Sequence, residues 1–92
     1  VRHFSTRDIF LLRRGVFQWN LERTSMQVQP KLAGANLRGL DISGANLIHA
    51  DLFGADLRSA NLFNADLHGA DLHGADLHSA YGLTQNQINQ DN

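Results

Sequence analysis

A unit of five residues repeats ten times between Pro30 and Ser79, and this period restricts the fold more than any other feature of the sequence. The centre of each unit is Leu or Ile. Ala stands two positions before the centre, except at Pro30 and Leu40, and Asp or Asn stands one position before it, except at Lys31. The ten centres are Leu32, Leu37, Ile42, Leu47, Leu52, Leu57, Leu62, Leu67, Leu72 and Leu77.

A period of five is incompatible with a long α-helix and with a straight strand. In a helix each residue advances about 100°, so leucines at this spacing would rotate about 140° at each step and form no apolar stripe. In a strand an odd period turns successive leucines to opposite faces. The leucines can all point inward only if the chain turns a corner once per unit. Four corners close a coil of about 20 residues, and such coils stack about 4.8 Å apart as a solenoid.

The residue types at the other positions fit this coil. Leu or Ile fills the narrow axis, and Ala lies where the wall leaves room for only a methyl group. Asp or Asn suits the exposed edge, because its side chain can bond nearby backbone at a turn. We therefore predict that the ten central residues form the core. The last place of each unit holds mostly turn-tolerant residues, namely Gly34, Gly39, Gly44, His49, Gly54, Ser59, Asn64, Gly69, Gly74 and Ser79.

The units resemble the pentapeptide-repeat family, whose pattern is A(D/N)LXX, over 50 of the 92 residues. The resemblance implies an all-β fold, a right-handed quadrilateral β-helix of about 2.5 coils, with an N-terminal α-helical cap. The departures from the pattern are Pro30 and Lys31, which open the first unit, and Leu40, which is larger than Ala and could bulge one corner.

Residues 1–29 are expected to form a helical capping segment, in a chain long enough for one domain. Ser5 or Thr6 can cap a helix that runs to about Arg23, weakened in the middle by Gly15. One face of this helix is predicted to contain four residues at 3-4-3 spacing, widened by two aromatic residues. The four are Ile9, Leu12, Val16 and Trp19, and the two are Phe10 and Phe17.

The segment LLRRGVFQWNLER resembles the leader that precedes the repeats in many bacterial, especially cyanobacterial, family members. Gly15-Val16 and Trp19-Asn20 are the pairs that recur in that leader. The main interpretation is a helix that seals the first coil. The alternative is a helix that docks on a partner or a membrane surface through Arg13, Arg14, Phe10 and Phe17.

The repeat region spans residues 30–80, and residues 81–92 are expected to form a C-terminal cap and a frayed tail. Tyr81-Gly82 breaks the pattern, and Thr84 can cap a short helical turn. Leu83 and Ile88 would close this end of the coil. The sequence GLTxxQ also resembles the family's ends.

The sequence predicts no metal or cofactor site. There is no cysteine, so neither a disulfide nor a thiolate metal site is possible. His68, His73 and His78 look like a cluster, but they follow leucines on successive sides of the coil and cannot share one tetrahedral ion.

Catalysis is not expected either. Two pairs of aspartates stack between coils, Asp51 with Asp71 and Asp56 with Asp76, but a convex wall offers no cleft to desolvate a general acid. No nucleophile elbow or phosphate-binding glycine loop is present. We therefore predict a protein that is not an enzyme.

The charge distribution indicates no nucleic-acid partner. The net charge is −1, made of +3 in residues 1–29, −3 in residues 30–80 and −1 from Asp91. No apolar run reaches the ~20 residues of a membrane span and no signal peptide is evident, so a cytoplasmic location is expected. The chain begins with Val rather than Met, which favours a fragment, whereas the cap-like tail argues against one.

The predicted function is a rigid scaffold or protein–protein interaction module. Phe53, Phe63 and Ile48 occupy outward positions and are the candidate contacts for an unknown protein partner or for self-association. Some family members inhibit gyrase as long, acidic, dimeric mimics of DNA, which is one alternative. Another is an adaptor or a fragment of a larger signalling protein.

Overall fold

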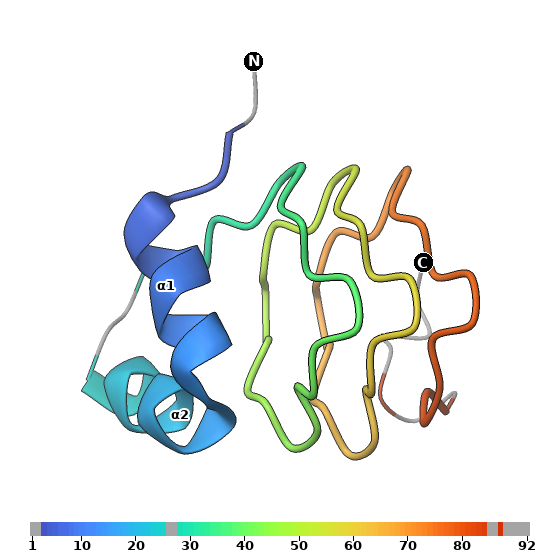
Figure 1. The fold of residues 1–92 in the computed structure, drawn as a ribbon. Helices are drawn as coiled ribbons and strands as arrows, with labels where there is room; N and C mark the ends of the chain where they lie inside the picture. The colour runs from blue at the N-terminus through green and yellow to red at the C-terminus, as the bar shows by residue number, and fades with distance from the viewer. Residues whose placement is uncertain (1–2, 26–27, 85–86, 88–92) are drawn as a thin grey trace.

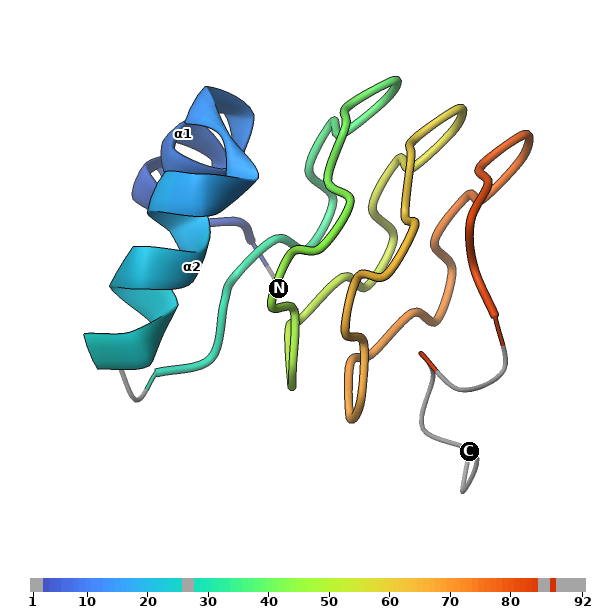
Figure 2. The same cartoon turned by 90° about the horizontal axis from the view of Figure 1, so that it is seen from below.

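Two helices lie across one end of a stack of coils in the computed structural model, which describes residues 3–25, 28–84 and 87 (Figure 1). Helix α1 spans Thr6–Arg14 and helix α2 spans Val16–Ser25. The repeat then winds away from the helices in coils that lie side by side, as the view turned by 90° also shows (Figure 2). The helices and the coils are therefore joined end to end along one axis.

The helical segment contains two helices, so the prediction of one continuous helix is wrong. Gly15 has φ 140° and ψ 151°, far from helical values, and its N–H donates to the Leu12 carbonyl at 3.2 Å. A residue with a side chain rarely adopts such a φ, so Gly15 ends α1 instead of merely weakening it. The predicted cap at Ser5 is confirmed, because its hydroxyl accepts the Asp8 N–H at 3.2 Å.

Each five-residue unit contains one tight turn. The carbonyl of the central Leu accepts the N–H of the Ala three residues later, as between Leu32 and Ala35 at 3.0 Å. The residue before that Ala has a positive φ, for example 71° at Gly34, which is typical of a type II turn. Four units place another residue there, at φ between 61° and 64°. These are His49, Ser59, Asn64 and Ser79.

The predicted all-β class and right-handed quadrilateral β-helix are contradicted. The regular elements of the described residues are the two helices, and the repeat makes only isolated bridges. The cause lies in the unit itself, because a turn in every five residues leaves no extended segment long enough for a continuous ladder.

The coils are joined by parallel bridges between residues 20 apart, from Lys31–Asp51 to Asn61–Tyr81. Backbone hydrogen bonds accompany these bridges. The Leu37 N–H donates to the Asp56 carbonyl at 2.8 Å, and the Asp56 N–H donates to the Ala35 carbonyl at 2.9 Å. The stacking interval is therefore the one that a four-cornered coil requires.

The core runs along the axis of the coils and under the helices. The eight repeat centres from Leu32 to Leu67 are at most 1% exposed, whereas Leu72 and Leu77 are only partly buried. Leu40 packs partly buried against this core, and its carbonyl keeps the inter-coil hydrogen bond from the Asn61 N–H at 2.9 Å. The larger side chain is thus accommodated without loss of pairing.

Candidate interaction surfaces

The edge of the first coil is covered by the segment that carries α1. A first coil has no preceding coil to bond its backbone, so its polar groups need other partners. The Lys31 N–H donates to Asp8 Oδ2 at 2.8 Å, and the Lys31 carbonyl accepts the Ser5 N–H at 2.8 Å. Phe4 and Leu32 form an antiparallel bridge beside them. Backbone and side-chain groups of the α1 segment thus make the hydrogen bonds that a preceding coil would otherwise make.

Helix α2 also supplies hydrogen-bond partners to the first coil, through the adjacent residues Trp19 and Asn20. Trp19 Nε1–H donates to the Asn46 carbonyl at 2.8 Å, and Asn20 Oδ1 accepts the Asn46 N–H at 2.8 Å. Asn20 Nδ2 also donates to the Gly44 carbonyl at 3.0 Å. The sequence shows Trp19-Asn20 as a pair, but the bonding role of Asn20 emerges only when α2 lies over the coil.

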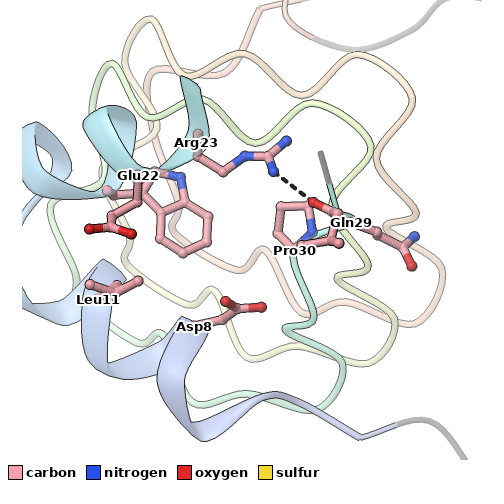
Figure 3. Close-up of a pocket in the computed structure, with 8 residues that line it drawn as sticks. Asp8, Leu11, Glu22, Arg23, Gln29 and Pro30 are labelled. Carbon is pink, nitrogen blue, oxygen red and sulfur yellow. Dashed lines mark hydrogen bonds between the residues drawn. The ribbon is translucent and has the colours of Figure 1, made fainter. Parts of the chain in front are cut away.

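A small pocket remains where α2 meets the chain that enters the first coil (Figure 3). Its volume is about 10 Å³, which is the space of one water molecule and too little for a small-molecule ligand. Arg23 crosses it and donates from Nη1 to the Val28 carbonyl at 2.8 Å and from Nη2 to the Ile48 carbonyl at 3.2 Å. The lining residues are Asp8, Leu11, Trp19, Glu22, Arg23, Val28, Gln29 and Pro30.

At the other end, Gln87 is buried and bonds to the last coils. Its Nε2 donates to the Leu62 carbonyl at 2.6 Å and to the Ala65 carbonyl at 2.9 Å, and its Oε1 accepts the Thr84 N–H at 2.7 Å. Its own carbonyl accepts the Leu67 N–H at 2.9 Å. The expectation of fraying is therefore wrong for this residue.

Thr84 lies at the start of the turn predicted there. Its carbonyl accepts the Gln87 N–H at 3.1 Å. Leu83 packs partly buried against the core, while Ile88, the second residue expected to close this end, lies outside the described residues.

The Asp and Asn side chains of the repeat bond the backbone two residues on, as the sequence predicts. Oδ1 accepts the N–H of the residue after the central Leu or Ile at 3.0–3.2 Å in nine units. These carboxylates and amides therefore hold turns, including the two stacked aspartate pairs. The nine are Asn36, Asp41, Asn46, Asp51, Asp56, Asn61, Asp66, Asp71 and Asp76.

The side chains of His68 and His73 are each paired with the aspartate of their own unit, whereas His78 bonds Asp76 through its backbone N–H. His68 Nδ1 lies 2.6 Å from Asp66 Oδ1, and His73 Nδ1 lies 2.7 Å from Asp71 Oδ1. Burial opposes ionisation of Asp66, but the hydrogen bonds from the His68 side chain and backbone lower its pKa. Among the described residues, no group of three His, Asp or Glu side chains is placed to hold a metal ion.

Arg58 makes a bidentate ion pair on the coil surface. Its Nε and Nη2 donate to the two oxygens of Asp56 at 2.9 and 2.8 Å, and Asp76 lies 3.7 Å away on the next coil. The hydrogen bond from Arg58 lowers the pKa of Asp56 from 3.8 to about 2. The side chains of Arg58 and Asp56 are 40% and 26% exposed, so the pair is a partly solvated surface feature.

Phe53 and Phe63 are exposed, at 43% and 59%, and Ile48 is partly buried. The two aromatic residues are half a coil apart and lie on different sides. Gly82 packs closely against the backbone of Phe63. A Cβ atom added to Gly82 would lie only 2.5 Å from the Phe63 nitrogen. The structure therefore presents these residues to solvent without bringing them into one patch.

Three further apolar side chains are exposed on the helices. Phe10 is 57% exposed and Phe17 is 78% exposed, so the expectation that they widen the inward face is wrong. The change of direction at Gly15 leaves Leu12 and Trp19 buried and these two rings outside. Leu21, which no sequence pattern distinguishes, is 50% exposed. No described helix has the length and apolar character needed to cross a membrane.

The stacked coils and their turn-holding carboxylates define a repeat protein of a general scaffold or interaction kind. A sequence model of pentapeptide repeats matches residues 29–58 and 41–78, with 8 copies. The matches cover more than half of the chain, which therefore belongs to the pentapeptide-repeat family, a family that is generally non-enzymatic. No curated protein and no solved structure matches the chain.

Proposed function

We propose that this protein is a non-enzymatic, rigid scaffold that binds a protein partner through the side of the coils that carries Phe53. The observation that carries the proposal is an exposed aromatic ring on a backbone fixed from both sides. The Phe53 carbonyl accepts the Gly34 N–H at 2.8 Å, and the Phe53 N–H donates to Asp51 Oδ1 at 3.1 Å. A ring held in this way loses little conformational freedom when it enters a partner's pocket.

The neighbours of Phe53 leave the ring accessible. Coil stacking places Ala33 before it and His73 after it on the same side, and Gly54 follows it in sequence. Two of these neighbours, Ala33 and Gly54, are small and leave the Phe53 ring 43% exposed, as an aromatic anchor of a protein interface requires. Phe63 is the more exposed ring, at 59% against 43%, but the residue 20 positions after it is Leu83 of the C-terminal segment. Phe53 has a repeat coil on each side of it, and we therefore choose the Phe53 side as the candidate.

The test compares Phe53→Ser with Arg38→Ser, a matched exposed position of the same repeat place. Purified tagged proteins are used to capture partners from the source cells, and their thermal unfolding is followed by circular dichroism. We expect a defined partner to be lost with Phe53→Ser and retained with Arg38→Ser, with folding intact in both. If the partner is bound equally by Phe53→Ser, another surface makes the contact and the proposal is wrong.

A further inference from the structure

We propose that the outward face of the helix pair binds an anionic lipid surface. This aromatic–arginine face consists of Phe10, Arg13 and Arg14 of α1 and of Phe17 and Leu21 of α2. It lies at the end of the molecule, away from the repeat, and is independent of the Phe53 side. The site goes beyond the proposed scaffold role, since it would place the scaffold on a membrane.

The inward side of α2 is fully used by the coil. Trp19 and Asn20 bond Asn46 and Gly44, and Trp19 is 2% exposed. Phe17 and Leu21 are one helical turn apart, and both are exposed on the other side of α2. Their apolar surface therefore contributes nothing to sealing the first coil.

Helix α1 adds to the same face. A shallow hollow between the two helices is lined by Phe10, Leu11 and Arg14 of α1 and by Gln18 of α2. Gln18 is itself exposed, so the hollow connects Phe10 with the exposed side of α2. Two helices thus present their large apolar side chains together instead of scattering them over the surface.

The charge of this face is positive. Arg13 and Arg14 are exposed, and the Arg14 guanidinium lies 5.4 Å from the centre of the Phe10 ring. The two acidic residues of the helices are paired, and Glu22 also accepts from Gln18 at 3.3 Å beside the hollow. Asp8 accepts the Lys31 N–H, and Glu22 accepts from Arg7 at 3.1 Å. Cations in the last turn of α1 also complement the helix dipole, but that role does not explain the exposed rings.

The chemistry favours a lipid interface over a protein groove. Aromatic and aliphatic side chains that protrude from short helices can enter the boundary between headgroups and acyl chains, while arginines at their edge contact anionic headgroups. A planar interface needs no matching pocket for each protruding side chain. An acidic protein surface would satisfy Arg13 and Arg14 but would leave the apolar side chains of Phe17 and Leu21 without apolar contacts.

The test is co-sedimentation with vesicles of phosphatidylcholine, with and without phosphatidylglycerol. We expect binding to the anionic vesicles and little binding to the neutral ones. The double variant Arg13→Gln/Arg14→Gln should weaken binding about 30-fold, since each cation near an anionic surface contributes about fivefold. Phe10→Ser/Phe17→Ser should weaken it at least tenfold, a roughly additive loss of two apolar anchors.

Matched controls come from the repeat. Arg38→Gln and Phe53→Ser remove the same side-chain types from the coils and should leave vesicle binding unchanged. Circular dichroism and thermal unfolding establish that each variant is folded. The proposal is overturned if the wild-type protein does not bind anionic vesicles. It is equally overturned if the controls weaken binding as much as the helix variants, or if Phe10→Ser/Phe17→Ser binds like wild type. It is also overturned if that variant abolishes a wild-type dimer while vesicles are not bound.

Failure here leaves the scaffold proposal intact. Vesicle binding depends on Arg13, Arg14, Phe10 and Phe17, whereas partner capture depends on Phe53. Loss of partner binding in Phe53→Ser with normal vesicle binding would separate the two surfaces experimentally.

Discussion

The two ends of the coil stack contain the same repeat and differ in what lies over them. Leu37, Leu57 and Leu77 occupy the same position in successive coils, yet the first two are fully buried and Leu77 is only partly buried. The helices cover the first coil, while the described residues after Ser79 cover less of the last one. The difference teaches that the repeat determines which side chains point inward and the caps determine how far they are buried.

The caps also differ in how they bond to the coil. At the first coil, groups from five residues of the helical segment replace a missing neighbour. They are Ser5, Asp8, Trp19, Asn20 and Arg23. At the last coils, Gln87 makes three of the described hydrogen bonds to the repeat, with the Leu62 and Ala65 carbonyls and the Leu67 N–H. The hydrogen bonds between cap and coil are therefore shared among several residues at the helical end and concentrated in one residue at the C-terminal end.

Replacement of Trp19 should lower stability more than any other of the changes that compare the two ends. Trp19→Ala deletes a side chain that is 2% exposed and its bond to the Asn46 carbonyl, and should lower the free energy of unfolding by about 3–5 kcal/mol. Urea unfolding followed by circular dichroism measures the change. Phe17→Ala, two residues earlier and exposed, should change stability by no more than about 0.5 kcal/mol. Equal losses in both variants would mean that α2 does not seal the coil through Trp19.

Leu37 and Leu77 occupy the same position in the first and last coils, and their replacement should give the next largest difference in stability. Leu37→Ala should cost about 2–5 kcal/mol, because it opens a cavity in a sealed core. Leu77→Ala should cost about 1 kcal/mol, because part of that side chain already meets solvent. Denaturant titrations of both variants measure the difference. Similar costs would show that the C-terminal end is covered as completely as the first coil.

Replacement of Asn20 tests the helical end, where several residues share the hydrogen bonds to the coil. Replacement of Gln87 tests the C-terminal end, where one residue makes several of them. Gln87→Ala leaves the Ala65 carbonyl without its buried donor and should cost about 2–3 kcal/mol. Asn20→Ala should cost about 1–2 kcal/mol, because its bond to Gly44 is exposed and Trp19 still bonds the Asn46 carbonyl. Thermal unfolding ranks the two variants. The reverse order would place the more important bonds at the helical end.

Acid should have the smallest of the four effects, and it should act through the Arg58–Asp56 pair. The Arg58 hydrogen bond lowers the pKa of Asp56 to about 2 in the folded chain, below the ordinary value of 3.8. The ionised Asp56 therefore stabilises the fold above pH 3.8, and this contribution is lost as the pH falls toward about 2. Amide NMR spectra recorded during acidification should show the signal of the Arg58 N–H, which donates to Asp56 Oδ1 at 3.1 Å, changing as the pH falls from 3.8 toward about 2.

Arg58→Gln is the control for this acid response. It removes the cause of the lowered pKa of Asp56 and should move the local change to higher pH. An unchanged profile would assign the acid response to other carboxylates, such as Asp66, whose pKa is also lowered.

The sequence alone predicts the inward positions and the stacking interval, because a fixed period leaves few geometries for the leucines. It also predicts the bonds of the Asp and Asn side chains, which depend only on residues two positions away. These features are local or periodic, so no tertiary contact is needed to infer them.

The features that the sequence did not predict depend on contacts between distant segments. The apolar spacing continues on both sides of Gly15, so nothing local indicates that the helix ends there or that Phe10 and Phe17 remain exposed. Gln87 is one of several amide residues in a polar tail, and only the nearby carbonyls of Leu62 and Ala65 distinguish it. The all-β class failed for a different reason, since each unit forms a turn and a single bridge instead of a strand.

Stacking at an interval of 20 residues makes the two ends independently adjustable. Four added units would move the C-terminal end about 4.8 Å further from the helices without rotating it, because they complete a coil. A single added unit would instead turn that end by about a quarter of a revolution. Evolution or design can therefore set the distance and the angle between the helical cap and the C-terminal end by the number of units alone.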